Sequence, residues 1–147
     1  MYKYVLVIHI IAATVWTGGH LVLALAFLPR ILREGSVEGL LAFEGAYEKW
    51  GMSALIIQVV SGLWLAWFRL PDVAAWLAAD SFVARLILLK LLLLGLTLAV
   101  AIDARMRIIP HLSVQTLPAM ARRVRLVTLL GVAFVVVGTS FRTGPWW

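Results

Sequence analysis

Two histidines lie inside the first long apolar stretch of the chain, residues 4–28. His9 and His20 are eleven residues apart in the sequence, so in a helix they share one face and lie roughly 16 Å apart along its axis. Neutral imidazole binds copper or haem iron. The two rings are therefore candidate metal ligands at two separate positions. In a transporter, an ion would occupy these two binding sites one after the other. The alternative is that each ring only makes a hydrogen bond to a neighbouring helix.

Lys90 lies in the middle of an uninterrupted leucine-rich run, from Leu86 to Leu94, with no acidic residue within one turn. A lysine at the centre of a membrane helix costs roughly 2.5–3.5 kcal/mol on insertion scales. One explanation is that the ammonium group extends to the nearer lipid headgroups. The other is that Lys90 and His9 face each other at similar depth, because the first and third apolar stretches run in the same direction. Such a pair would bind an anionic or redox-active group.

Two further polar residues are candidates for binding a cofactor. Gln58, in the second apolar stretch, is a candidate hydrogen-bond partner of His9 or His20. Arg30 follows Pro29 at the end of the first stretch, and we expect it to join one ion-pair network. This network would either interact with lipid headgroups or hold carboxylates of a ligand. Its other expected members are Glu44, Glu48, Asp103, Arg105, Arg107 and His111.

The composition is that of an integral membrane protein. Of 147 residues, 63% are hydrophobic and 14% are charged, whereas a soluble domain is about 45–50% apolar and about 25% charged. These values exclude an ordinary soluble, disordered or fibrous chain. The net charge of +6 is then better explained by contact with lipid headgroups than by nucleic acid binding. The absence of cysteine excludes disulfides, thiolate metal sites and cysteine nucleophiles.

Four apolar stretches are near the length of roughly 20 residues that a membrane helix requires. They cover about residues 4–28, 53–68, 83–102 and 124–141. We therefore predict an all-α, antiparallel four-helix transmembrane bundle that forms a single domain over residues 1–147. Between spans one and two, the charged stretch from Arg30 to Trp50 predicts a short amphipathic helix at the membrane interface.

Basic residues are distributed unequally between the two sides of this bundle. The first and third connections, with the start of span four, carry eight Lys and Arg residues. The opposite side carries Lys3, Arg69 and Arg142, or four with Arg85. Since basic residues favour the cytoplasmic side, we expect a multi-pass protein of a bacterial-type inner membrane with both termini on the outer side.

Several strings of the sequence resemble the CopD-like copper-resistance membrane family, over nearly the whole chain. In span one these are His9-Ile10-Ile11, Trp16-Thr17-Gly18-Gly19-His20 and Phe27-Leu28-Pro29-Arg30. Further along they are Glu44 and Glu48, Gln58 with Ser61 to Ala66, Lys90 to Leu94, Arg105 with Arg107 to Pro110, and Gly138 to Gly144. The resemblance implies a copper-handling membrane protein. CopD-like relatives often have a further histidine near the start of span four, where Arg122 and Arg123 stand here.

The sequence also resembles the HemJ-type protoporphyrinogen oxidases, which are related four-helix proteins. The shared features are His9, Leu28-Pro29-Arg30, the run from Gly62 to Trp67, and Lys90. This resemblance implies that His9 is an axial ligand of haem b. It also implies that Lys90, the candidate catalytic residue, binds a porphyrin carboxylate or assists proton removal. That family usually has Tyr-His near the end of span three, where this chain has Val100-Ala101-Ile102-Asp103.

Three functions follow as hypotheses, and whether the chain is an enzyme is left open between them. The first is a CopD-like protein that handles a redox metal centre, copper or haem, through His9 and His20. The second is a haem b-dependent oxidase of the HemJ type. The third is a non-catalytic accessory subunit whose polar residues pack the bundle against a larger membrane complex. The lipid bilayer is the expected partner in every case, with a homo-oligomer or a larger complex as the alternatives for protein partners.

Overall fold

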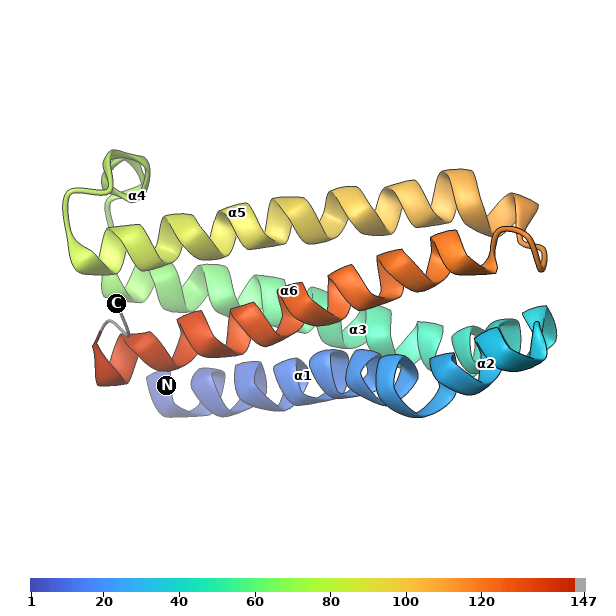
Figure 1. Cartoon of the computed structure of the whole chain (residues 1–147). Helices are drawn as coiled ribbons and strands as arrows, with labels where there is room; N and C mark the ends of the chain where they lie inside the picture. The colour runs from blue at the N-terminus through green and yellow to red at the C-terminus, as the bar shows by residue number, and fades with distance from the viewer. Residues whose placement is uncertain (145–147) are drawn as a thin grey trace.

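Four long helical segments make up the computed structural model of the chain, which describes residues 1–144 (Figure 1). They run from Tyr2 to Glu34, Val37 to Arg69, Phe82 to His111 and Leu117 to Thr143, and each is long and apolar enough to cross a membrane. No strand occurs in the part of the chain that the structure describes. The predicted all-α class is thus confirmed, and each predicted span lies inside one of these segments.

Two of the segments contain a widened helical turn just before a proline. The first segment consists of α1 (Tyr2–Val22), a π-helical turn η1 (Leu23–Phe27) and α2 (Leu28–Glu34). The third consists of α5 (Phe82–Asp103), a π-helical turn η2 (Ala104–Ile108) and a short 3-10 turn η3 (Ile109–His111). Pro29 and Pro110 each follow the π turn by two residues. Proline lacks an N–H group and its ring clashes with the preceding turn, so the helix widens there without ending.

The second segment is a single helix, α3 (Val37–Arg69), of 33 residues. Ser36 starts it, because its hydroxyl accepts a hydrogen bond from the backbone N–H of Gly39 at 3.0 Å. At 1.5 Å per residue α3 is about 50 Å long, well beyond the roughly 30 Å of a hydrocarbon core. The expected separate interfacial helix between spans one and two is therefore not present in the described residues. The charged stretch is divided between α2 and the first turns of α3, which extend the second span.

The remaining elements connect and complete the bundle. Asp72 caps a short helix, α4 (Val73–Ala78), and Ser81 caps α5. The last helix, α6 (Leu117–Thr143), follows a loop at residues 112–116. Gly35 adopts a left-handed conformation with φ of 62°, which ends α2 and turns the chain into α3.

Consecutive long helices run in opposite directions (Figure 1). The turns at residues 35–36 and 112–116 lie at one end, here called the connection end, and the N-terminus lies at the other, the terminus end (Figure 1). Helix α1 packs closely against α3 and α6, and α5 packs closely against α6. The buried core at the connection end includes Leu28, Leu40 and Leu117. Toward the terminus end, Leu86, Leu93 and Val137 form a smaller core between α5 and α6.

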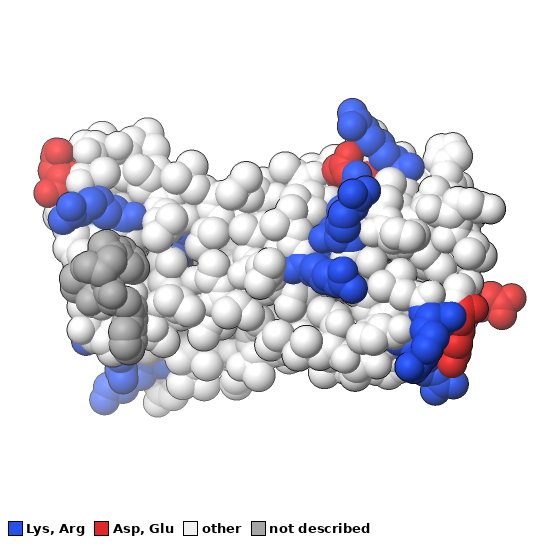
Figure 2. All heavy atoms as spheres, in the orientation of Figure 1, with Lys and Arg blue, Asp and Glu red and all other residues white. Residues whose placement is uncertain are grey.

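The surface is divided as a membrane requires. Charged side chains gather toward the two ends of the molecule, and an uncharged belt lies between them (Figure 2). On this face the basic side chains of the connection-end half reach toward the middle of the molecule. Large apolar side chains such as Ile11, Ile56, Leu96 and Leu129 are more than half exposed along the helices. In water this exposure would be unfavourable, but in a bilayer lipid covers it.

Candidate functional site

His9 is held against helix α3 by a hydrogen bond. Its Nδ1 atom lies 2.9 Å from the hydroxyl oxygen of Ser61. That hydroxyl donates its only hydrogen to backbone carbonyl oxygens of its own helix, chiefly that of Ile57 at 2.5 Å. Ser61 therefore accepts from His9, so that Nδ1 carries the hydrogen. The ring lies over Gly62, where an added Cβ would come within 3.0 Å of its Cε1 atom.

His20 is fixed in the same tautomer by a different partner. Its Nδ1 atom lies 2.9 Å from the carbonyl oxygen of Trp16, one turn earlier on α1. A carbonyl oxygen can only accept, so Nδ1 again carries the hydrogen. In the neutral form of each imidazole, Nε2 then has a free lone pair. Among the hydrogen bonds of residues 1–144, none uses Nε2 of His9 or His20. Both rings therefore offer the same nitrogen to a ligand.

An aromatic cluster surrounds His20. The ring centroids of Trp16 and Tyr47 lie 4.7 Å and 5.8 Å from that of the imidazole. The Tyr47 hydroxyl donates to the carbonyl of Trp16 at 2.9 Å, so this oxygen accepts from both Tyr47 and His20. Gly19 and Gly51 make room for the Tyr47 ring between α1 and α3. Tyr47 was not among the residues predicted from the sequence, because it lies in the charged stretch between the first two predicted spans.

Lys90 points from α5 toward α6. Its Nζ atom lies 5.5 Å from the centroid of the Phe141 ring, and an added Cβ on Gly138 would come within 3.3 Å of it. No acidic group within the described residues forms an ion pair with Lys90. Its ammonium group is also near enough to His9 for its charge to act on that imidazole. Lys90 thus points toward α6, and its charge acts on the first histidine.

Gln58 lies one turn before Ser61 on α3 but makes a different contact from the one expected. Its Oε1 atom is buried and has no hydrogen-bond partner in the described part of the chain. The partner of His9 is Ser61, and that of His20 is a backbone carbonyl. The buried amide oxygen of Gln58 remains free to accept from, or coordinate, a bound group.

The charged residues at the connection end do not form the single network that the sequence suggested. Arg30 is exposed and pairs with Glu34 at 2.9 Å on its own helix, away from both histidines. Arg105 pairs separately with Glu48 at 2.9 Å, which ties η2 to α3. Asp103 pairs with Arg123 of α6 and, at 3.4 Å, with Arg107. Within residues 1–144, Glu44 and His111 form no ion pair.

No group of three or more His, Asp or Glu side chains that could hold a metal ion occurs in the described residues. A metal bound here would therefore have one imidazole as its main protein ligand at each position. At His9 the contacting group is the Ser61 hydroxyl, and the charge of Lys90 acts on the ring. At His20 they are aromatic rings and backbone carbonyls. The two histidines are thus placed in chemically different surroundings.

Comparison with known proteins gives one family. The family model described as copper resistance protein D (CopD) matches residues 41–141, which is more than half of the chain. No curated protein and no solved structure matches the chain. The matched region covers Gln58, Ser61 and Lys90, while both intramembrane histidines precede it.

Proposed function

The chain belongs to the copper resistance protein D family, and from this premise we propose that it binds copper ions as cargo inside its helical bundle, through His9 and His20. The family and the four apolar helices make it a multi-pass membrane protein concerned with copper resistance. The observation that carries the proposal is the state of the two rings. Each has its Nδ1 hydrogen bound by a protein oxygen, which leaves Nε2 to a metal.

The residues present fit copper coordinated by nitrogen. Imidazole is a good ligand for copper. The chain has no cysteine, and Met120 is buried among apolar residues of the connection-end core. Ser61 and the Trp16 carbonyl orient the two rings from behind, as outer-shell partners of metal-binding histidines do. At the first position, the free Oε1 of Gln58 is the candidate additional donor. Lys90 could act as a donor only after its ammonium group had lost a proton.

The separation of the histidines supports two distinct copper-binding sites rather than one site that both histidines share. Both belong to α1, and eleven residues at 1.5 Å each place them roughly 16 Å apart. Helix α1 runs from the terminus end toward the connection end (Figure 1), so His9, which comes first in the chain, lies nearer the terminus end than His20. A copper ion would therefore bind at one ring and then at the other. With basic residues on the cytoplasmic side, we propose a bacterial-type inner membrane with both termini outside.

A second candidate function rests on the proximity of Lys90 to His9. An imidazole beside a buried ammonium group suits haem b, with His9 as an axial ligand and Lys90 binding a porphyrin carboxylate. Haem would supply one-electron chemistry to such a protein. His20 could not be the second axial ligand, because it is too far along the same helix. Arg30 pairs with Glu34 near the connection end, so a role for it in holding carboxylates requires that pair to open.

Metal analysis and a visible spectrum of one purified sample separate these functions. We expect the wild type to bind copper, and we expect the amount of bound copper per protein to be lower in His9→Ala and in His20→Ala. The amount should be unchanged in His111→Ala. His111 is a matched control because it lies in η3, outside the bundle interior. A Soret band in the wild type that is lost in His9→Ala would show that the bound group is haem rather than copper. Neither metal nor colour, with all variants still folded, would refute both and favour an accessory subunit.

A further inference from the structure

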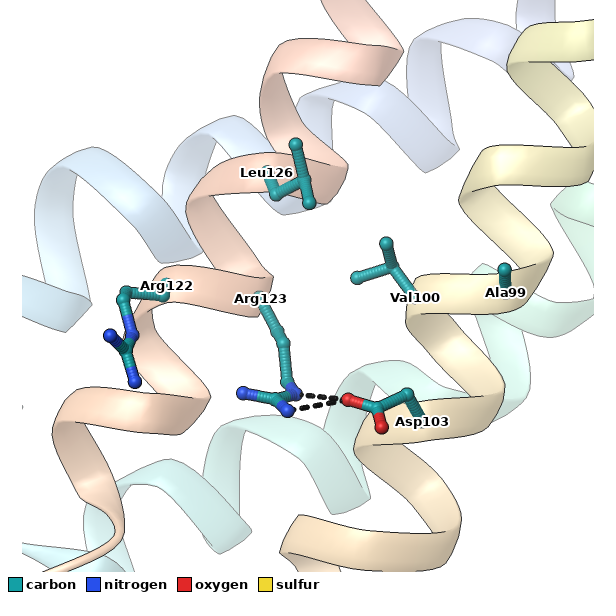
Figure 3. Close-up of a pocket in the computed structure, with 6 residues that line it drawn as sticks. All are labelled: Ala99, Val100, Asp103, Arg122, Arg123 and Leu126. Carbon is teal, nitrogen blue, oxygen red and sulfur yellow. Dashed lines mark hydrogen bonds and ion pairs between the residues drawn. The ribbon is translucent and has the colours of Figure 1, made fainter.

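A groove of about 360 Å³ opens between α5 and α6 near the connection end. Ala99, Val100 and Asp103 line it from α5, and Arg122, Arg123 and Leu126 line it from α6 (Figure 3). One part of the groove is therefore apolar and the other part is charged. Neither histidine nor Lys90 lines it, although Val100 also packs against the core cluster that contains Trp16. Its own lining residues, and not the copper proposal, carry the inference below.

The Asp103–Arg123 pair closes the charged part of the groove and is fixed in place. Arg123 donates from Nε to Oδ2 of Asp103 at 2.6 Å and from Nη1 to the carbonyl of Ala119 at 3.0 Å. The other carboxylate oxygen lies 3.4 Å from Arg107. One carboxylate thus serves two guanidinium groups, and neither Asp103 nor Arg123 is free to exchange partners at low cost.

Arg122 is the uncompensated charge of the groove. Its side chain is exposed and forms no ion pair within the described part of the chain. Figure 3 shows its side chain extending from α6 away from the Asp103 carboxylate, so that it lines the groove at the outer, α6 edge. Arg125, also exposed, follows one turn later, and basic side chains lie over this part of α6 (Figure 2). The groove therefore carries net positive charge and attracts an anion.

The depth of these residues identifies the kind of anion. Helix α6 has 27 residues and is about 40 Å long, so its first turns lie outside a hydrocarbon core of roughly 30 Å. Arg122 is five residues into the helix, about 8 Å from its start. Its backbone therefore lies close to the boundary of that core, from which a long arginine side chain reaches the headgroups. The apolar lining residues of both helices lie about one turn farther from the connection end than the charged ones; they are Ala99, Val100 and Leu126. This apolar surface would not contribute to the binding of a small soluble anion. A phospholipid, in contrast, has an acyl chain that can pack against it.

We propose that this groove binds one anionic phospholipid, with its phosphodiester against Arg122 and an acyl chain along Ala99, Val100 and Leu126. Basic pockets between membrane helices recognise anionic lipid headgroups in this way. The Asp103–Arg123 pair keeps the two helices apart at the right distance and orients the groove. The lipid would fill the space between α5 and α6 and so stabilise their packing at the connection end.

Lipid binding to the purified full-length protein tests this proposal. The protein in detergent is titrated with phosphatidylglycerol or phosphatidylcholine, and bound lipid is counted by native mass spectrometry. We compare the wild type with Arg122→Gln, with Ala99→Phe and with the control Arg33→Gln. Arg33 is an exposed arginine of the same end that lies on α2, away from the groove. Circular dichroism and gel filtration establish that each variant is folded.

The expected result is selective binding of phosphatidylglycerol that Arg122→Gln weakens about fivefold, as one basic group near a lipid surface does. Ala99→Phe keeps the charge and fills the apolar part, so it should weaken binding as well, while Arg33→Gln leaves it unchanged. Equal losses in Arg122→Gln and Arg33→Gln would mean diffuse electrostatic attraction and overturn the proposal. Unchanged binding in Ala99→Phe, or displacement of the lipid by millimolar inorganic phosphate, would also overturn it.

Discussion

Gly19→Ala is expected to destabilise the protein far more than Gly18→Ala, although the two glycines are adjacent on α1. A Cβ added at Gly19 would lie 2.6 Å from the Tyr47 hydroxyl oxygen and closer still to two carbons of its ring. A Cβ at Gly18 would meet nothing within 4 Å. The Tyr47 ring cannot simply move aside, because Gly51 of its own helix touches it and its hydroxyl is bonded to the Trp16 carbonyl.

The magnitude follows from these contacts. Overpacking a well-filled interface costs about 1–3 kcal/mol, and loss of the Tyr47 hydrogen bond adds about 1 kcal/mol. We therefore expect Gly19→Ala to lower the free energy of unfolding by about 3 kcal/mol. Gly18→Ala should leave it unchanged or raise it by up to about 1 kcal/mol, because alanine favours helix.

Unfolding by sodium dodecyl sulfate in mixed micelles, followed by circular dichroism, measures both variants. The double variant Gly19→Ala, Tyr47→Ala is the decisive comparison. Once the ring is removed, the added methyl group has nothing to displace, so Gly19→Ala should cost nothing more in the Tyr47→Ala background. Equal stability of Gly18→Ala and Gly19→Ala, or a full cost of Gly19→Ala without the ring, would refute the packing described here.

Two predictions concern the histidine site and one concerns the connection end. Ser61→Ala removes the acceptor that orients the His9 imidazole and should weaken copper binding about 10- to 100-fold in a copper titration. The control is Ser53→Ala, an exposed position on the same helix, which should leave the copper affinity unchanged. Gly62→Ala should lower copper binding with a loss of stability below about 1 kcal/mol, because its Cβ would push that ring by a few tenths of an ångström; unchanged affinity would contradict the ring position. Asp103→Asn should lower the free energy of unfolding by about 1 kcal/mol, more than the roughly 0.3–0.5 kcal/mol expected for Glu34→Gln in an exposed helical pair; equal losses at low salt would show that the α5–α6 ion pair adds nothing.

The candidate site was only partly accessible from the sequence. His9, His20 and Lys90 were identifiable because an ionisable side chain in a long apolar run is costly and therefore informative. Ser61 was not identified as the partner of His9, because serine is common where membrane helices pack. Tyr47 gave no signal at all, since an aromatic residue among charged ones is ordinary at an interface.

The extent of the second helix was also misjudged. Charged residues between Arg30 and Trp50 indicated an interfacial segment, but local polarity does not say whether a helix bends at the membrane surface or continues through it. Here α3 continues, and Glu48 at its connection end reaches Arg105 of the neighbouring segment. Contacts of this kind, between residues far apart in the chain, decide where such a helix points.

Apolar run lengths alone determined that this chain has four membrane-spanning helices, because each helix must satisfy its backbone hydrogen bonds within itself and match the bilayer thickness. The tertiary structure decided which side chain each polar group meets. His9 meets Ser61 rather than the side chain of Gln58, and Arg30 pairs with Glu34 rather than joining the expected network. One residue of helical rotation turns a side chain by about 100°, and one residue of axial offset moves it by about 1.5 Å. Those two quantities depend on how helices pack against one another, which no single helix encodes.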